Sequence, residues 1–106
     1  MSKNLKLIIT EATNHCQNLR RDVKILVPKS TITQAYSAFM ESTGTVKKKV
    51  QYADKTLTLA MGEISGVSDQ HYDTVYVINP QEMEDDVLEE IKAIPNKDGL
   101  LICVKL

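Results

Sequence analysis

The sequence predicts an α+β domain arranged as a two-layer sandwich, in which a mixed sheet of about five or six strands carries two main helices on one face. Apolar segments with the period of a strand are interleaved with two longer segments that have the period of a helix. The 106 residues are enough for one domain, 1–106, with its own core. Apolar residues at 42% and charged residues at 25% are typical of a globular chain rather than a disordered one.

The first two predicted strands lie near the N-terminus. Alternating apolar residues in the segment LKLIIT (5–10) would turn one face of a strand toward the core. Residues 12–21 fit two structures: a short helix that Thr13 caps, or an irregular polar loop. The apolar run VKILV (23–27) is the second strand, and Pro28 ends it.

The clearest helix follows the second strand. Thr31 and Gln34 have the spacing of a capping box, in which both side chains bind free backbone N–H groups at the start of a helix. Gly44 is the residue at which we expect the helix to end. The apolar stripe of this helix consists of Ile32, Ala35, Tyr36, Phe39 and Met40.

A β-hairpin and a buried strand are predicted next. Residues 46–51 and 56–63 flank a turn at 52–55, and apolar residues alternate along the second arm. The stretch 62–72 is a polar connection. Residues 73–78 are apolar on both faces, which is typical of a strand in the middle of a sheet.

The second helix has its own start signal. Asn79 is a candidate cap, Pro80 stands at the first helical position, and the acidic Glu82 stands at the third. Residues 95–99 break the helix, and residues 100–106 form the last strand. The buried stripe of this helix would consist of Met83, Val87, Leu88, Ile91 and Ile94.

Two stretches of the chain repeat one pattern. Residues 22–28 run as a strand into the first helix, and residues 73–80 run as a strand into the second, each with a further strand behind it. Right-handed crossovers would then place both helices on the same face of one sheet. This arrangement resembles the split βαβ unit of ferredoxin-like domains, with extra strands here. The resemblance concerns architecture alone and implies no activity.

The charges are sorted along the chain. Residues 1–56 have a net charge of +6 and residues 57–106 a net charge of −7, although the whole chain carries only −1. Such asymmetry bears on partners rather than on the fold. A homo-oligomer held together by opposite charges is one arrangement that it allows.

The acidic residues gather on the second helix. The helix dipole stabilises acids in the first turn by about 0.3–1 kcal/mol each, but Glu89 and Glu90 lie beyond that turn. A solvated helix face explains most of this cluster, and the excess suggests a surface for a basic partner or a mimic of nucleic-acid phosphates. The predicted partner-binding residues are Glu82, Glu84, Asp85, Asp86, Glu89 and Glu90.

The basic residues suggest a rival function. Lys47 and Lys49 share one face of the first hairpin arm, Lys55 projects from the turn, and Arg20 and Arg21 form a second pair. Together these side chains would suit the phosphates of a nucleic acid. Aromatic residues make up only 5% of the chain, so bases would find few stacking partners. Lysines on an outer strand also serve simply to prevent edge-to-edge aggregation.

Signals for catalysis or metal binding are weak. Asp69, His71 and Asp73 would point one way in an extended segment and suit a hard metal ion, although such loops are more often only solvated. Cys16 could approach His71 only through the fold. Residues 28–31 lack the glycine that brings a phosphate close to the backbone. No phosphate-binding, dinucleotide-binding or zinc-protease motif occurs, so we expect no enzyme, no metal and no cofactor.

The remaining evidence concerns the compartment. Two cysteines are too few for a disulfide framework, which favours reduced thiols in the cytoplasm. The apolar run at 7–9 is shorter than a signal peptide or a membrane span requires. We therefore predict a small, cytoplasmic, non-enzymatic interaction or regulatory protein that binds a protein partner through a charged surface and does not contact membranes. A nucleic-acid-binding accessory protein that uses the basic hairpin is the alternative.

Overall fold

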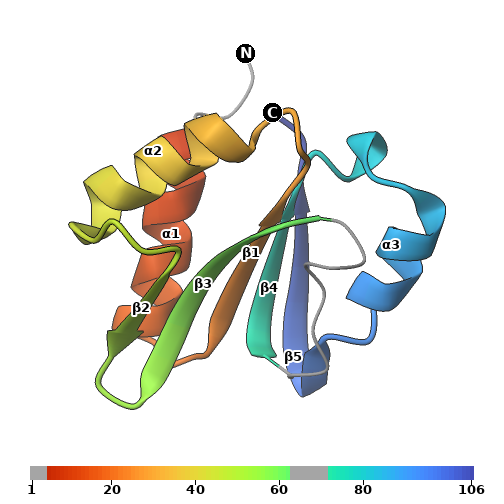
Figure 1. Cartoon of the computed structure of the whole chain (residues 1–106). Helices are drawn as coiled ribbons and strands as arrows, with labels where there is room; N and C mark the ends of the chain where they lie inside the picture. The colour runs from red at the N-terminus through yellow and green to blue at the C-terminus, as the bar shows by residue number, and fades with distance from the viewer. Residues whose placement is uncertain (1–4, 63–71) are drawn as a thin grey trace.

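The computed structural model describes residues 5–62 and 72–106 of the chain. Within these ranges no helix is long and apolar enough to cross a membrane. The helices are α1 (Leu5–Gln17), α2 (Ile32–Thr43) and α3 (Asp85–Ile91) (Figure 1). The strands are β1 (Val23–Val27), β2 (Lys49–Tyr52), β3 (Lys55–Met61), β4 (Tyr72–Ile78) and β5 (Pro95–Val104).

The strands form one mixed sheet in the order β2-β3-β1-β4-β5. β1 runs parallel to β3 and β4, and β4 runs parallel to β5, whereas β2 is antiparallel to β3. β2 and β5 are therefore the two edges of the sheet (Figure 1). The predicted class, an α+β domain with a mixed sheet, is confirmed, and the ferredoxin-like template fits only coarsely.

The helices cover both faces of the sheet, so the prediction of two main helices on one face is wrong (Figure 1). Ile25 and Val27 of β1 belong to the core beneath α1 and α2, whereas Leu26 packs on the opposite side with Val87 and Ile91 of α3. The crossover from β1 to β3 and the crossover from β4 to β5 run toward opposite edges. Two crossovers of the same hand that run in opposite directions place their helices on opposite faces.

The first helix, α1, occupies the place of the strand predicted over 5–10. Ile8, Ile9, Ala12 and Cys16 are buried at helical spacing. Leu7, which a strand would have buried, is 66% exposed. Over a few residues the spacing of apolar side chains fits both a helix and a strand. The helix becomes evident only when the pattern is followed beyond the first turn. Of the two structures that residues 12–21 fitted, the helix is observed through Gln17.

The second helix, α2, forms where it was predicted. Phe39 is fully buried, and Gly44 adopts the left-handed conformation (φ 73°) that ends a helix, with its N–H bonded to the Met40 carbonyl. Thr31 precedes α2, but its side chain makes no capping hydrogen bond. The predicted capping box is therefore wrong.

The hairpin is confirmed as β2 and β3, and the buried strand is confirmed as β4. The helix predicted from Pro80 is shorter than expected, because Pro80–Glu82 form a 3₁₀ turn and α3 begins only after Glu84. β5 already begins at Pro95, so the predicted break lies inside a strand. Most of the predicted connection at 62–72 falls outside the described residues.

Candidate functional site at the α3–β5 face

β5 is an edge strand with exposed apolar side chains. It pairs with β4, and no described strand lies on its other side. Leu100 is 44% exposed, Leu101 is 39% exposed, and Cys103 is also exposed. Because side chains alternate along a strand, Leu101 and Cys103 share the α3 side of the sheet, whereas Leu100 and Ile102 face the α1 side.

The helix beside this strand is short and acidic. α3 has seven residues and buries Val87 and Ile91 against the sheet. Asp85 and Asp86 lie in its first turn, where the helix dipole favours negative charge. Leu88 is partly buried, and the remaining four residues of the helix are acidic.

A groove with a volume of about 520 Å³ lies between α3 and β5. Val77, Leu88 and Leu101 are among its apolar lining residues, and Asp85 and Glu89 are its acidic ones. The complete lining is Val77, Pro80, Asp85, Leu88, Glu89, Ile91, Lys92, Leu101 and Cys103. We call this groove, together with the outer edge of β5, the α3–β5 face. It offers apolar contacts and two carboxylates at the same place.

A second hollow, of about 300 Å³, lies at the carboxyl ends of β1 and β3. Open parallel sheets commonly bind ligands at this end. Here Glu82, Glu84 and Asp86 line the hollow, and Lys29 is the basic residue among its lining. The Ser30 hydroxyl, which a phosphate would need, donates instead to the Glu82 carboxylate at 2.6 Å. Three carboxylates in the lining disfavour an anionic ligand.

Five of the six predicted acids therefore divide between two cavities. Asp85 and Glu89 line the α3–β5 face, and Glu82, Glu84 and Asp86 line the hollow at the carboxyl ends of the strands. Glu90 is exposed and lines neither cavity. The structure thus brings two of the six residues to the apolar groove.

The basic candidates on the hairpin are also divided. Lys47 and Lys49 are exposed, and Lys49 lies on the α3 side of the sheet, opposite Thr58 of β3. Lys55 pairs with Tyr52 on the other side, and its ammonium lies 3.9 Å from the Asp22 carboxylate. The three lysines therefore do not share one face.

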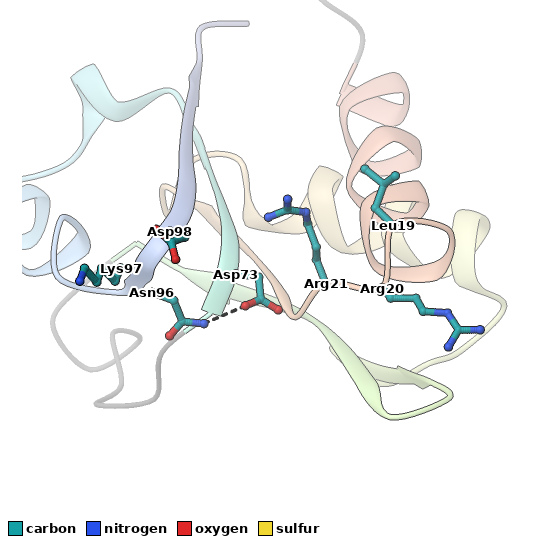
Figure 2. A pocket seen from close by; sticks show the side chains of 7 residues that line it. All are labelled: Leu19, Arg20, Arg21, Asp73, Asn96, Lys97 and Asp98. Carbon is teal, nitrogen blue, oxygen red and sulfur yellow. Dashed lines mark hydrogen bonds between the residues drawn. The ribbon is translucent and has the colours of Figure 1, made fainter.

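Arg20 and Arg21 line a third, wide hollow of about 630 Å³ at the start of β4 and β5 (Figure 2). Figure 2 shows the two guanidinium groups pointing away from each other. Asp73 accepts a hydrogen bond from the Asn96 amide and another from the Asp22 N–H, both at 2.8 Å. The Asp22 N–H, above all, holds the pKa of the Asp73 carboxyl below its ordinary value. Because the arginines diverge, they do not converge on one ligand.

Burial shifts the pKa values of Cys16 and Lys24. Burial, followed by the charge of Asp22, raises the pKa of the Cys16 thiol to about 11, so this thiol is protonated near neutral pH. Lys24 is only 3% exposed, with its ammonium 5.4 Å from the centre of the Tyr72 ring, and burial lowers its pKa. The sequence did not single out Lys24.

The catalytic and metal hypotheses involve residues that the structure describes only in part. His71 and Asp69 lie outside the described residues. Asp73, the remaining member of that set, already binds the Asp22 N–H and Asn96. In the described part of the chain no three side chains of the metal-binding types gather around one point.

Sequence reasoning missed the apolar half of the α3–β5 face. Leu100, Leu101 and Cys103 were placed in the last strand, but that strand's position at an edge was not predicted. One available signal was that LLIC is apolar on both faces, as β4 is, so this strand would expose apolar side chains if it lay at an edge of the sheet.

The chain was compared with models of known protein families, with curated proteins and with solved structures, and none of the three comparisons finds a match. Any functional conclusion therefore depends on the geometry described above.

Proposed function

We propose that this protein is a non-enzymatic interaction module that binds a protein partner at the α3–β5 face. One observation carries the proposal: an edge strand with exposed leucines, which no described strand pairs on its outer side, borders an apolar groove whose acidic residues are Asp85 and Glu89. The matching partner is an extended segment with apolar residues at alternate positions and Lys or Arg between or beside them.

Strand addition supplies most of the binding free energy in this mode. An extended segment that pairs with a sheet edge gains backbone hydrogen bonds, and pockets for its alternate side chains give specificity. Along the α3 side of β5, Leu101 and Cys103 lie in the groove and would contact those side chains.

The carboxylates contribute orientation and speed of association. Oppositely charged surfaces steer encounter and suppress wrong partners more than they raise affinity. A basic segment would meet Asp85 and Glu89, whereas an acidic segment would be repelled. This prediction of charge preference separates the proposal from non-specific hydrophobic binding.

The experiment uses a labelled peptide of alternating valine and lysine, with a valine–glutamate peptide of equal length as its control. Binding is followed by anisotropy, and the contact surface is mapped from amide chemical shifts. Asp85→Lys with Glu89→Lys should abolish binding, and Glu90→Lys, on the same helix but outside the groove, should leave it unchanged. If charge reversal prevents folding, the neutral pair Asp85→Asn with Glu89→Gln is titrated in its place.

The same titration includes single-stranded RNA and duplex DNA, because Lys47 and Lys49 are the exposed lysines that a phosphate backbone would contact. Peptide binding that perturbs the amides of α3 and β5 supports the proposal. Equal binding of both peptides, or shifts confined to other elements, contradicts it. Salt-sensitive binding of nucleic acid that Lys47→Ala with Lys49→Ala abolishes would favour the nucleic-acid function instead.

A further inference from the structure

We propose that the segment received by the α3–β5 face is β2 of a second copy of this chain, so that copies associate head to tail. This inference rests on the proposed function, because it names the partner of that site. It is carried by a complementarity between the two edges of the sheet, in charge and in the side chains on each face.

The charge complementarity follows from the sorting of charge along the chain. The +6 half includes β2 and the lysines that precede it, and the −7 half includes α3 and β5. β2 and β5 are opposite edges of one sheet (Figure 1). Lys47, Lys48 and Lys49 lie at the β2 edge, and the carboxylates of α3 lie beside the β5 edge. Two copies placed edge to edge in the same orientation bring these opposite charges together.

The side chains match on the α3 side of the sheet. Lys49 and Gln51 of β2 lie on that side, because their partners on β3 face away from the core beneath α1 and α2. In a sheet continued from β5 of one copy to β2 of the next, Lys49 would lie opposite Cys103 and Gln51 opposite Leu101, which brings Lys49 close to Asp85 and Glu89. An ammonium with an aliphatic stem suits a groove that is apolar with an acidic border.

The side chains also match on the opposite side. Val50 and Tyr52 of β2 are partly buried against the core beneath α1 and α2. In the continued sheet they would adjoin Leu100 and Ile102, the apolar residues of β5 on that face. Apolar residues thus meet apolar residues on one side, while lysine meets carboxylate on the other.

The orientation of the second copy is determined by the same alternation. β2 is antiparallel to the other strands, so a copy in the same orientation presents β2 antiparallel to β5. Turning the second copy over would make the pairing parallel and place Lys49 beside Leu100, with Val50 facing the carboxylates. Antiparallel pairing is therefore the arrangement that satisfies both faces.

Pairing of like edges is disfavoured. Two β5 edges related by a two-fold axis perpendicular to the sheet would bring two acidic α3 helices together on one side. Two β2 edges would bring the triple-lysine segments 47–49 together. Like charges across an interface lower the affinity. Two identical edges therefore repel each other, whereas the β2 edge of one copy attracts the β5 edge of another. The resulting contact is heterologous and leaves a free edge at each end, so association continues into open chains.

The first test is sedimentation velocity over a range of concentrations at low and high salt. The sedimentation coefficient should rise with concentration at low salt, and the apparent dissociation constant should increase about tenfold or more at high salt, because the charges are screened. Lys47→Glu with Lys49→Glu should be monomeric, and Asp85→Lys with Glu89→Lys should be monomeric. Mixing these two variants restores complementary edges and should restore association. Glu90→Lys serves as the matched control and should behave as wild type.

The second test fixes the geometry by disulfide cross-linking. Cys103 is exposed in the groove and Cys16 is buried. Lys49→Cys, which would stand opposite Cys103 on the α3 side and leaves Lys47 and Lys48 in place, should cross-link with Cys103 of another copy on mild oxidation and give a ladder of oligomers on a non-reducing gel. Val50→Cys, on the opposite side of the same strand, should give no ladder, and Cys103→Ser should abolish the ladder of the first variant.

A monomer at every concentration and salt would overturn this inference, and so would association that the charge reversals leave unchanged. If the protein stays monomeric while the valine–lysine peptide binds the α3–β5 face, the inference fails and the proposed function stands. If neither the peptide nor a second copy binds there, both fail.

Discussion

The two edges of the sheet differ in almost every property. β2 has four residues, of which Lys49 and Gln51 are exposed, and it rests on the core beneath α1 and α2. β5 has ten residues, exposes Leu100 and Leu101, and adjoins the seven-residue helix α3. Natural proteins use lysines and short strands to keep sheet edges from pairing. β2 has both of these protections, and its lysines act against a second basic edge rather than against an acidic one. The leucine stretch of β5 has neither protection.

This difference shows that the chain protects one edge of its sheet and not the other, although single apolar residues such as Leu7 and Val46 are exposed elsewhere. The chain places Lys47, Lys48 and Lys49 at one edge, so the protective device is present in the sequence. The leucine stretch of β5 has no such lysines and lies next to a groove with acidic residues, which suggests that this edge receives a partner. An edge left open beside a groove is where a partner strand is expected.

The largest expected effect on stability comes from a substitution in the core that supports the β2 edge. Phe39→Ala removes a fully buried ring from the core on which Val50 and Tyr52 also pack. We expect a loss of about 3–5 kcal/mol in the free energy of unfolding, from lost burial and the cavity that remains. Urea denaturation followed by circular dichroism measures it. Val87→Ala, under α3, is the comparison on the β5 side and should cost less, since a smaller group is removed. An unchanged midpoint for Phe39→Ala would contradict the packing of α2.

The next effect concerns the attachment of β5 to the rest of the sheet. The Asp73 carboxylate accepts hydrogen bonds from the Asp22 N–H, before β1, and from Asn96 at the start of β5. Asp73→Ala should lower the free energy of unfolding by about 1–3 kcal/mol, because two donors lose an ionised partner. Asp98→Ala, in the same hollow, is the control and should have a much smaller effect.

The contribution of Asp73 should depend on pH with a definite sign. The Asp22 N–H holds the pKa of this carboxyl below its ordinary value in the folded state. A lowered pKa means that the group stabilises the fold fully above its unfolded pKa of about 3.9, and that the contribution is lost as the pH falls through the folded value. The difference between wild type and Asp73→Ala should be full at pH 7 and shrink below about pH 4. A difference that grew on acidification would contradict this account.

Much of the fold could be predicted because its signals are local. The apolar run of β1 predicts a strand, and the apolar stripe around Phe39 predicts a helix, from neighbouring residues alone. The segment at 5–10 satisfies both the helical and the strand period over its short length, which is why its pattern predicts a strand where α1 forms. The positions of helices on the two faces depend on the strand order, and that order is set by pairing between segments distant in sequence.

The candidate site was predictable only in its charged half. The acidic residues of α3 stand out in the sequence because charge is visible without a fold. Leu101 and Cys103 do not, since an apolar strand has the same composition at an edge as at the centre of a sheet. Only the structure shows that nothing described pairs with the outer side of β5 and that Leu88 approaches it across a groove.

Placing a lysine on the β5 edge, or a leucine on the β2 edge, should change stability little and solubility clearly. Leu100→Lys should raise the concentration at which the protein aggregates, and Lys49→Leu should lower it, because an apolar edge is then exposed on both sides of the sheet. Both side chains are exposed, so the free energy of unfolding should change by only about 0.5 kcal/mol. Light scattering against concentration measures the first quantity and thermal melting the second. Equal aggregation of the two variants would remove the distinction between the edges.

The smallest expected effect on stability comes from Lys92, which lines the groove among carboxylates. Its ammonium lies 3.0 Å from the Glu89 carboxylate, and both side chains are well exposed. Lys92→Ala should therefore cost only about 0.2–0.5 kcal/mol in the free energy of unfolding.

The same substitution should act on binding in the opposite direction. Removing the ammonium frees Glu89 and makes the α3–β5 face more negative, so the valine–lysine peptide should bind about twofold or more tightly at low salt. Lys105→Ala makes the same change of charge on an exposed residue that does not line the groove, and should leave the affinity nearly unchanged. Isothermal titration of both variants with the same peptide compares them directly. Weaker binding by Lys92→Ala would mean that the peptide does not meet the carboxylates of this face, because a neighbouring cation can only oppose a basic ligand there.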